Sequence, residues 1–334
     1  MRESYGGPRT GASAAAGAGA TADAIARQLA ARSGARVAIR SLPTLESLDP
    51  IERMPARVEA SPALEGDEVR RRTVPGTPTA GFEAFLDGIQ RSVVLPHARP
   101  AVPIVHGTVA AAIRRRVDRQ METWGGGPIV RQAVFSAIDR LDNDTVAVIR
   151  DAGVTVVDTG GEPGHPTEAL GVARDAIQRM REEVEAELAR RWCDASPKPL
   201  YVDGGIAALG VPATSEAVVG VVKSHRTLYV GADAMDVVTG LAAGERTTAF
   251  TVSSRHRARV ASWYLRLRDG DGADPFSGIV RIEVAEATFS ESRADAVSRW
   301  VLAERTPVSL PDTRWRVMAY GIRDVESYLR AVTP

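Results

Sequence analysis

Lysine is nearly absent from this chain: of its 42 basic residues, only Lys198 and Lys223 are lysines, and the others are arginines. The 42 acidic residues balance them, so the formal net charge is zero. No overall positive field therefore favours a polyanionic partner, and any contact with nucleic acid must come from a local patch. Arginine suits bidentate phosphate contacts, but an alanine- and arginine-rich composition explains most of these residues equally well.

Cysteine is almost absent too, since Cys193 is the single one. One cysteine excludes an internal disulfide and fits a reducing compartment. The sequence contains no uninterrupted apolar run of membrane-spanning length, and its N-terminus lacks the basic-then-apolar layout of a secretory signal. We therefore expect a cytoplasmic protein.

Several common site motifs are missing. No two histidines, and no histidine with the cysteine, stand at zinc-like spacing, which argues against a structural zinc. The chain has no Walker-type phosphate loop and no Gly-x-Ser-x-Gly elbow. The glycines at 125–127 lack a following lysine and fit an ordinary loop.

Composition divides the chain into three parts. Residues 1–20 are rich in glycine and alanine and are expected to be a disordered tail, because they offer little apolar surface to offset their ordering entropy. Residues 21–79 carry a short helix pattern at 21–31 and then a stretch rich in Pro, Glu and Arg, which we interpret as an arm or linker with a possible role in dimerisation. Residues 80–334 form the expected folded domain.

Within that domain, apolar patterning predicts strands first and then strands mixed with helices, which favours an α/β fold with a mixed sheet flanked by helices. The predicted strands are 82–86, 91–95, 102–106, 145–149, 154–157, 200–203, 218–223, 227–230, 247–252, 259–267 and 278–284, whereas 129–141 is ambiguous. The predicted helices are 109–119, 167–192 with Thr167 as N-cap, 233–241, 291–305 and 322–331.

Two predicted strands end in an Asp-Gly pair, at Asp87 and at Asp203. Metal-dependent phosphodiester hydrolysis needs carboxylates that converge on a hard cation, and rigid strand ends can supply them. Asp-Gly is also a favoured hairpin turn, so either pair alone is more easily read as a turn. That reading is weaker for Asp203, which is followed by two glycines and no direct hairpin return.

The long predicted helix offers a third carboxylate. At about 100° per residue, Glu185 and Glu187 flank its apolar stripe on opposite sides, so either could point to a site, and geometry does not choose between them. A solvated helix face is the plainer interpretation of both.

Basic and aromatic candidates follow the second Asp-Gly pair. Lys223 closes an apolar run, and its ammonium could reach a phosphate. Arg246, Tyr264 and Arg266 lie on predicted strands, where Tyr264 with Trp263 could stack a base. Each of them, taken singly, is more often a residue of a sheet face.

Taken together and in order, these stretches resemble the NurA nuclease family over roughly residues 80–330. The resemblance is carried by Phe85-Leu86-Asp87-Gly88, by the helix at 184–189 followed by Leu200-Tyr201-Val202-Asp203-Gly204, by the lysine-bearing run 220–224, and by the later strands at 241–247, 263–267 and 280–284. Each piece is weak alone, and the ordered set is more specific.

The resemblance implies a ribonuclease H-like core and a DNA nuclease dependent on manganese or magnesium. It implies metal ligands at Asp87, Glu185 and Asp203. Glu185 is favoured over Glu187 because the sequence of the helix aligns best with the family's glutamate at that position. It also implies a homodimer that docks on a HerA-like hexameric DNA-translocating ATPase, for DNA end processing or antiviral defence. On this reading Lys223 and Arg266 contact the phosphate of the DNA.

The chain departs from the family in two places. Ile89 stands where the family usually has a small polar residue, and no histidine occurs at 320–330, where the family commonly has one and this chain has Glu326 nearby. These departures leave open a catalytically weak dimeric adaptor that caps the translocase. A ribonuclease H-like enzyme acting on RNA is a third alternative.

Overall fold

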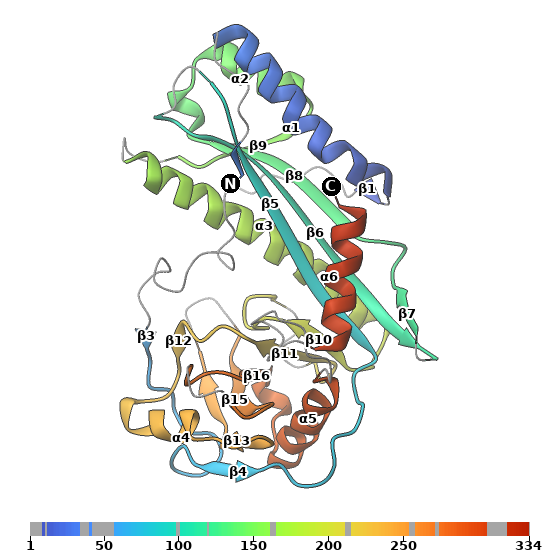
Figure 1. The fold of residues 1–334 in the computed structure, drawn as a ribbon, viewed down its shortest axis with the longest axis vertical. Coiled ribbons are helices and arrows are strands. Elements are labelled where there is room, and N and C mark those ends of the chain that lie inside the picture. The colour runs from blue at the N-terminus through green and yellow to red at the C-terminus, as the bar shows by residue number, and fades with distance from the viewer. Residues whose placement is uncertain are drawn as a thin grey trace.

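The computed structural model describes residues 9–10, 12–33, 40–41, 57–97, 101–118, 120–160, 165–210, 215–253, 258–270, 274–305 and 319–333. Within this part of the chain, a fourteen-stranded mixed sheet runs through the molecule, and helices flank it (Figure 1). The predicted α/β fold with a mixed sheet is therefore confirmed.

The strands fall into a long N-terminal group and a shorter C-terminal group. The first group is β1 (Arg9–Thr10), β2 (Arg40–Ser41), β3 (Arg57–Val58), β4 (Arg71–Thr73), β5 (Ala84–Leu95), β6 (Ile104–Val117), β7 (Gln120–Thr123), β8 (Ile129–Ser136) and β9 (Thr155–Asp158). The second is β10 (Leu200–Asp203), β11 (Val218–Val222), β12 (Thr227–Leu228), β13 (Glu245–Thr247), β14 (Phe250–Val252), β15 (Val260–Arg266) and β16 (Ile279–Ala285).

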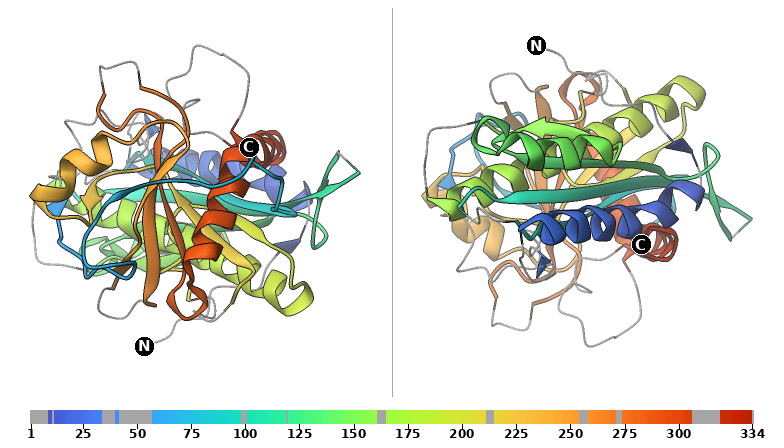
Figure 2. Two further views of the ribbon diagram at one scale, coloured as in Figure 1. Left: turned by 90° about the horizontal axis from the view of Figure 1, so that it is seen from below. Right: turned by 90° about the horizontal axis from the view of Figure 1, so that it is seen from above.

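The helices are α1 (Ala12–Ser33), α2 (Asn143–Asp151), α3 (Pro166–Ala195), α4 (Met235–Thr239), α5 (Glu291–Glu304) and α6 (Tyr320–Val332), with short 3-10 turns η1 (Ile138–Arg140), η2 (Ala232–Ala234) and η3 (Glu286–Thr288). Seen along the sheet, α1 and α6 lie on one face of the β5–β6–β8 layer and α3 lies on the other (Figure 2). α2 contacts α1 and β9, and its buried residues Val148 and Ile149 share an apolar cluster with α1.

The order of the central strands identifies the topology. β8, β6, β5, β10 and β11 are neighbours in that order; β6 is antiparallel to β8 and β5, whereas β10 is parallel to both β5 and β11. If these five strands are numbered by their order along the chain, their order across the sheet is 3-2-1-4-5, and α3 lies in the connection between strands 3 and 4. That arrangement is ribonuclease H-like, as the resemblance implied.

Alternation along the strands gives the sheet two distinct apolar layers. Leu86 and Val202 pack in the layer that contains the buried stripe of α3, namely Ile177, Met180, Val184, Leu188 and Trp192. Phe85 and Tyr201 pack in the opposite layer, with Ile322, Val325 and Leu329 of α6. A side chain on this part of the sheet therefore faces either α3 or α6.

Beyond β11 the sheet continues antiparallel through β16, β15 and β13 to β4, and β14 also pairs with β15. The segment from residue 57 thus belongs to the folded body, because β4 pairs with β13 and β3 pairs with β12. Residues 34–39 and 42–56 of the predicted arm lie outside the described residues. A role of the arm in dimerisation stays a prediction.

Three predictions of secondary structure are wrong. Residues 109–117 of the predicted helix 109–119 are the second half of β6. The alanines at 110–112 pair with β5, and Ala110 and Ala111 also pair with β8, and this pairing outweighs alanine's helix propensity. The predicted strand 145–149 is in α2, where the Asp142 side chain accepts a hydrogen bond from the backbone N–H of Thr145 and caps the helix. The predicted strand 82–86 does not end at Asp87 but continues to Leu95.

The N-terminal helix is longer than its pattern predicts. It begins at Ala12 and not at residue 21, so part of the expected disordered tail is helical, in keeping with its alanine content. Residues 1–8 and 11 lie outside the described residues. The predicted helices 167–192, 291–305 and 322–331 are confirmed as α3, α5 and α6, although His165 and not Thr167 caps α3.

Candidate metal centre

Parallel pairing of β10 with β5 brings the two Asp-Gly aspartates together. Leu86 lies opposite Val202, so the next residue of each strand, Asp87 and Asp203, stands at the same level of the sheet. Asp203 is the last residue of β10, and Gly204 then turns the chain with a φ of 122°, which a residue with a side chain rarely adopts. Asp87 lies inside β5, just past the point at which β10 leaves it.

A third carboxylate comes from α6. Asp87, Asp203 and Glu326 each offer an oxygen, and these oxygens lie within 4.8 Å of one another. Asp87 is buried, and Asp203 and Glu326 are half-buried. Asp87 and Asp203 share the alternation of Phe85 and Tyr201, which places all three carboxylates on the α6 face of the sheet.

The donor set suits a hard divalent cation. Mg²⁺ and Ca²⁺ bind oxygen ligands at about 2.0–2.6 Å, so one ion can contact oxygens up to about twice that distance apart. Oxygens within 4.8 Å of one another meet this condition. The three carboxylates contain no nitrogen or sulfur donor, so they favour Mg²⁺, Mn²⁺ or Ca²⁺ over softer metals.

Lys223 supplies positive charge to the cluster. It follows β11, and its Nζ donates to Asp203 Oδ2 at 2.8 Å, with both side chains 19% exposed. Burial acts to lower the pKa of Lys223, but the carboxylates of Asp203 and Asp87 outweigh it and raise this pKa above its usual value. Lys223 is therefore a cation at neutral pH, as the prediction of a phosphate contact requires.

The surroundings of Asp87 disfavour its ionised form. Burial raises its pKa well above the usual range, and the negative charges of Asp203, Glu326 and Glu185 raise it further, against the opposing effect of Lys223. A buried carboxylate crowded by others is a group that a divalent cation stabilises strongly.

Glu185, the predicted helix ligand, approaches from the other side of the sheet. It lies on α3, is buried, and its Oε1 lies 2.3 Å from the position that a Cβ on Gly88 would occupy. Gly88 therefore lets α3 come close to β5, and Glu185 acts on Asp87 by charge. Among the described residues, the group within 4.8 Å contains Glu326 and not Glu185.

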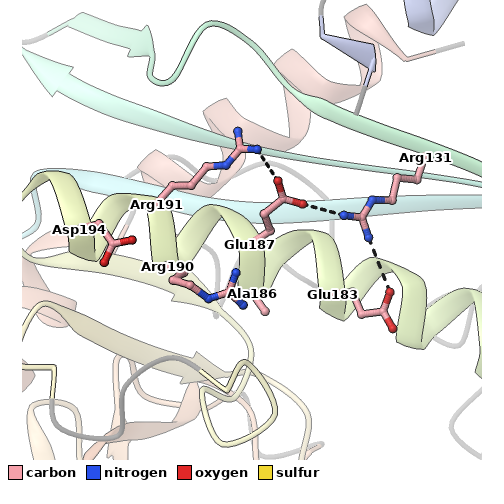
Figure 3. A pocket seen from close by; sticks show the side chains of 7 residues that line it. All are labelled: Arg131, Glu183, Ala186, Glu187, Arg190, Arg191 and Asp194. Carbon is pink, nitrogen blue, oxygen red and sulfur yellow. Dashed lines mark hydrogen bonds and ion pairs between the residues drawn. The ribbon is translucent and has the colours of Figure 1, made fainter. Parts of the chain in front are cut away.

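Glu187 is used elsewhere. It bonds Arg131 at 2.6 Å and also pairs with Arg191, in an open hollow of about 560 Å³ between α3 and β8 (Figure 3). Arginine and carboxylate side chains alternate around this hollow, and none of the three clustered carboxylates lines it. Of the two glutamates that the sequence left open, only Glu185 lies near Asp87.

The remaining predicted DNA contacts are structural residues, and their assignment needs correction. Arg246 is 0% exposed and pairs with Glu65 and Asp295 at 2.7 Å each. Arg266 is buried and donates to three backbone carbonyl oxygens. Tyr264 is also 0% exposed, and its hydroxyl accepts from the backbone N–H of Tyr229.

The sequence did not predict that these side chains are buried. A polar residue within an apolar strand is usually expected to point to solvent, and these three residues point into the protein. The sequence analysis also left Glu326 without a role. Its only sequence signal is its position beside the apolar stripe of a C-terminal helix, which many solvated glutamates share.

The chain is similar to known proteins at the level of the fold. No family model matches the chain, and no curated protein matches it. A solved structure, the crystal structure of the NurA nuclease from Sulfolobus solfataricus, is similar over 78% of this chain and 81% of that chain, with 9% identity and a TM-score of 0.44. At these values the likeness concerns the fold alone and assigns no residue a role. No helix in the described part of the chain is both long and apolar enough to cross a bilayer.

Proposed function

We propose that this chain is a divalent-metal-dependent deoxyribonuclease that hydrolyses phosphodiester bonds. One observation carries the proposal: Asp87, Asp203 and Glu326, from two parallel strands and a helix, bring their oxygens within 4.8 Å of one another on a ribonuclease H-like sheet. Such convergence of carboxylates costs stability through repulsion, and a bound cation removes that cost.

The proposed ligands are Asp87, Asp203 and Glu326, and the proposed ion is Mn²⁺ or Mg²⁺. When bound, the ion would supply Lewis acidity, which polarises the phosphodiester and makes water a better nucleophile. The chain's contribution is to hold the three carboxylates on rigid elements, so that little reorganisation is needed when substrate arrives.

Two further residues have proposed roles beside the ligands. Lys223 would contact a phosphate oxygen of the DNA, since its ammonium lies beside the Asp203 carboxylate at the edge of the cluster. Glu185 stays a proposed contributor through its charge, which adds to the negative potential at Asp87 from behind Gly88.

The finer points of the proposal rest on the sequence motifs. They are cleavage at a 5′ end or within single-stranded DNA, a homodimeric state, and action with a HerA-like hexameric translocase in DNA end processing or antiviral defence. RNA as substrate is the weaker alternative.

A second candidate function is a catalytically weak dimeric adaptor that caps the translocase. Its support is that the chain has no formal net charge and that three predicted DNA contacts, Arg246, Tyr264 and Arg266, are buried. Both candidates use the same fold and differ in whether the carboxylates bind a catalytic ion.

The test is degradation of labelled single-stranded DNA in Mn²⁺, for the chain alone and with a HerA-like ATPase. Asp203→Asn and Glu326→Gln each remove one proposed ligand with little change in shape. Glu187→Gln is the matched control, because it neutralises a glutamate that bonds Arg131 outside the cluster.

We expect wild type and Glu187→Gln to cleave, and the two ligand variants to lose cleavage while staying folded. A wild-type chain that binds the ATPase but cleaves DNA in no condition would favour the adaptor. Cleavage that survives both ligand substitutions would refute the proposed site.

A further inference from the structure

Arg114 connects three elements with one side chain. It lies on β6, where its Nε donates to Asp324 Oδ1 at 2.6 Å, Nη1 to Thr123 Oγ1 at 2.7 Å and Nη2 to the carbonyl oxygen of Met121 at 2.6 Å. Its guanidinium carbon also lies 4.9 Å from the centre of the Tyr328 ring. All three nitrogens of the guanidinium are thus used, and two of the four contacts are on α6.

The apolar contacts of α6 fix its distance from the sheet. Ile322, Val325 and Leu329 are buried against the sheet, and Gly321 lies so close to Phe85 that an added Cβ would stand 2.4 Å from the ring. Such a stripe resists separation but resists rotation of the helix about its own axis less well, because apolar contacts have no direction.

The positions around α6 show what a rotation would do. At about 100° per residue, Asp324 and Tyr328 lie on one flank of the buried stripe, and Glu326 lies on the other. A side-chain carboxylate stands about 5–6 Å from the helix axis, so a rotation of about 10° moves it by about 1 Å. Metal sites tolerate only about 0.2 Å in their ligand distances.

We propose that Arg114 is a positioning residue: by holding Asp324 and Tyr328, it fixes the rotation of α6 that places the Glu326 carboxylate beside Asp87 and Asp203. The inference rests on the proposed function, because it assigns Arg114 to the same metal site. Lysine cannot replace it, since one ammonium does not reproduce three fixed donors and a flat face on an aromatic ring.

The experiment measures Mn²⁺ affinity by titration calorimetry on the whole chain, without any activity assay. The variants are Arg114→Met, Glu326→Gln and the double variant. Arg115→Met is the matched control, because Arg115 is the next residue of β6 and points to the other face. Within the described residues, the partner of its side chain is Glu122, at 3.4 Å. Asp324→Asn is a milder second variant, which keeps the shape and the acceptor oxygen on a side chain that is 30% exposed.

Loss of a residue that orients a metal ligand typically costs 10–100-fold in metal affinity. We expect Arg114→Met to weaken Mn²⁺ binding by about 10-fold or more, Asp324→Asn to weaken it by a smaller factor, and Arg115→Met to leave it within about 2-fold. In the Glu326→Gln background, Arg114→Met is expected to have almost no further effect, because the ligand that it positions is already gone.

Two results would overturn the inference while leaving the metal site in place: unchanged Mn²⁺ affinity of Arg114→Met, or an equal loss of affinity with and without Glu326. The second would show that Arg114 acts through the general stability of the fold. A wild-type chain that binds no Mn²⁺ would overturn the proposed function, and this inference with it.

Discussion

Replacement of Lys223 by methionine tests the electrostatics of the carboxylate cluster most directly. Methionine keeps most of the length of the side chain and removes its charge, so three crowded carboxylates lose the cation that bonds Asp203 at 2.8 Å. We expect a protein that is less stable without metal and that binds metal more tightly.

The magnitude follows from the distance. Two unit charges 2.8 Å apart attract by about 6 kcal/mol at an effective dielectric constant of 20. Part of this is offset by the cost of burying the ammonium, and a carboxylate can take up a proton in its place. We therefore expect a loss of about 2–3 kcal/mol in the free energy of unfolding without metal. If the metal-bound form loses none of this stability, Mn²⁺ affinity rises by about 30- to 150-fold.

The assay is urea unfolding at pH 8 in EDTA and again in excess Mn²⁺, together with calorimetric titration of Mn²⁺. Lys198→Met is the control, because Lys198 is the chain's other lysine and is 59% exposed beside Glu83. It should change the free energy of unfolding by no more than about 0.5 kcal/mol. A Lys223→Met variant that is as stable as wild type in EDTA, or that binds Mn²⁺ more weakly, would refute the reasoning.

Three further predictions concern stability. Burial and neighbouring carboxylates raise the pKa of Asp87, so Asp87→Asn should stabilise the metal-free protein by about 1–3 kcal/mol at pH 8. The same variant should no longer gain stability from Mn²⁺, and urea unfolding measures both effects. Destabilisation in EDTA would count against a repulsive cluster. Burial lowers the pKa of His106 from 6.5 to about 4, so below pH 6.5 the unfolded chain binds the proton first, and stability should fall by about 3 kcal/mol between pH 6.5 and 4. His106→Gln should lose that part of the slope, and an identical pH profile would contradict it. Gly321→Ala forces a Cβ against Phe85 and should lower the free energy of unfolding by about 1–3 kcal/mol. Gly171→Ala, in open space on α3, should raise it by about 0.5–1 kcal/mol. Equal effects of the two substitutions would show that α6 is not closely packed.

The sequence predicts half of the candidate site well. Asp203 follows a short apolar run and precedes two glycines, and this local pattern is sufficient to place it at a strand end. Its closeness to Asp87 depends on the register between two strands that lie more than a hundred residues apart in the chain. A local pattern does not determine that register, and the sequence suggests it only because a similar apolar run precedes Asp-Gly in both strands.

The third ligand could not be predicted in the same way. Glu185 and Glu326 both border an apolar helical stripe, yet the sequence analysis offered Glu185 and Glu187 as ligands and not Glu326. The choice depends on which helix covers which face of the sheet. The same limit explains the error in β6. Ala110, Ala111 and Ala112 suit a helix locally, and only pairing with β5, and for Ala110 and Ala111 also with β8, makes them part of a sheet.

The buried ion pair of Arg246 with Glu65 has a consequence for how the chain is made. The two residues are 181 positions apart, yet each is almost completely enclosed in the finished protein. A ribosome adds about 5–20 residues per second, so about 10–40 s pass between synthesis of Glu65 and synthesis of Arg246. Arg72 also pairs with Glu65 and is made almost at once, but β13, which carries Arg246 and pairs with β4, is not yet present. The pairing of β4 into the sheet is therefore delayed until late in translation.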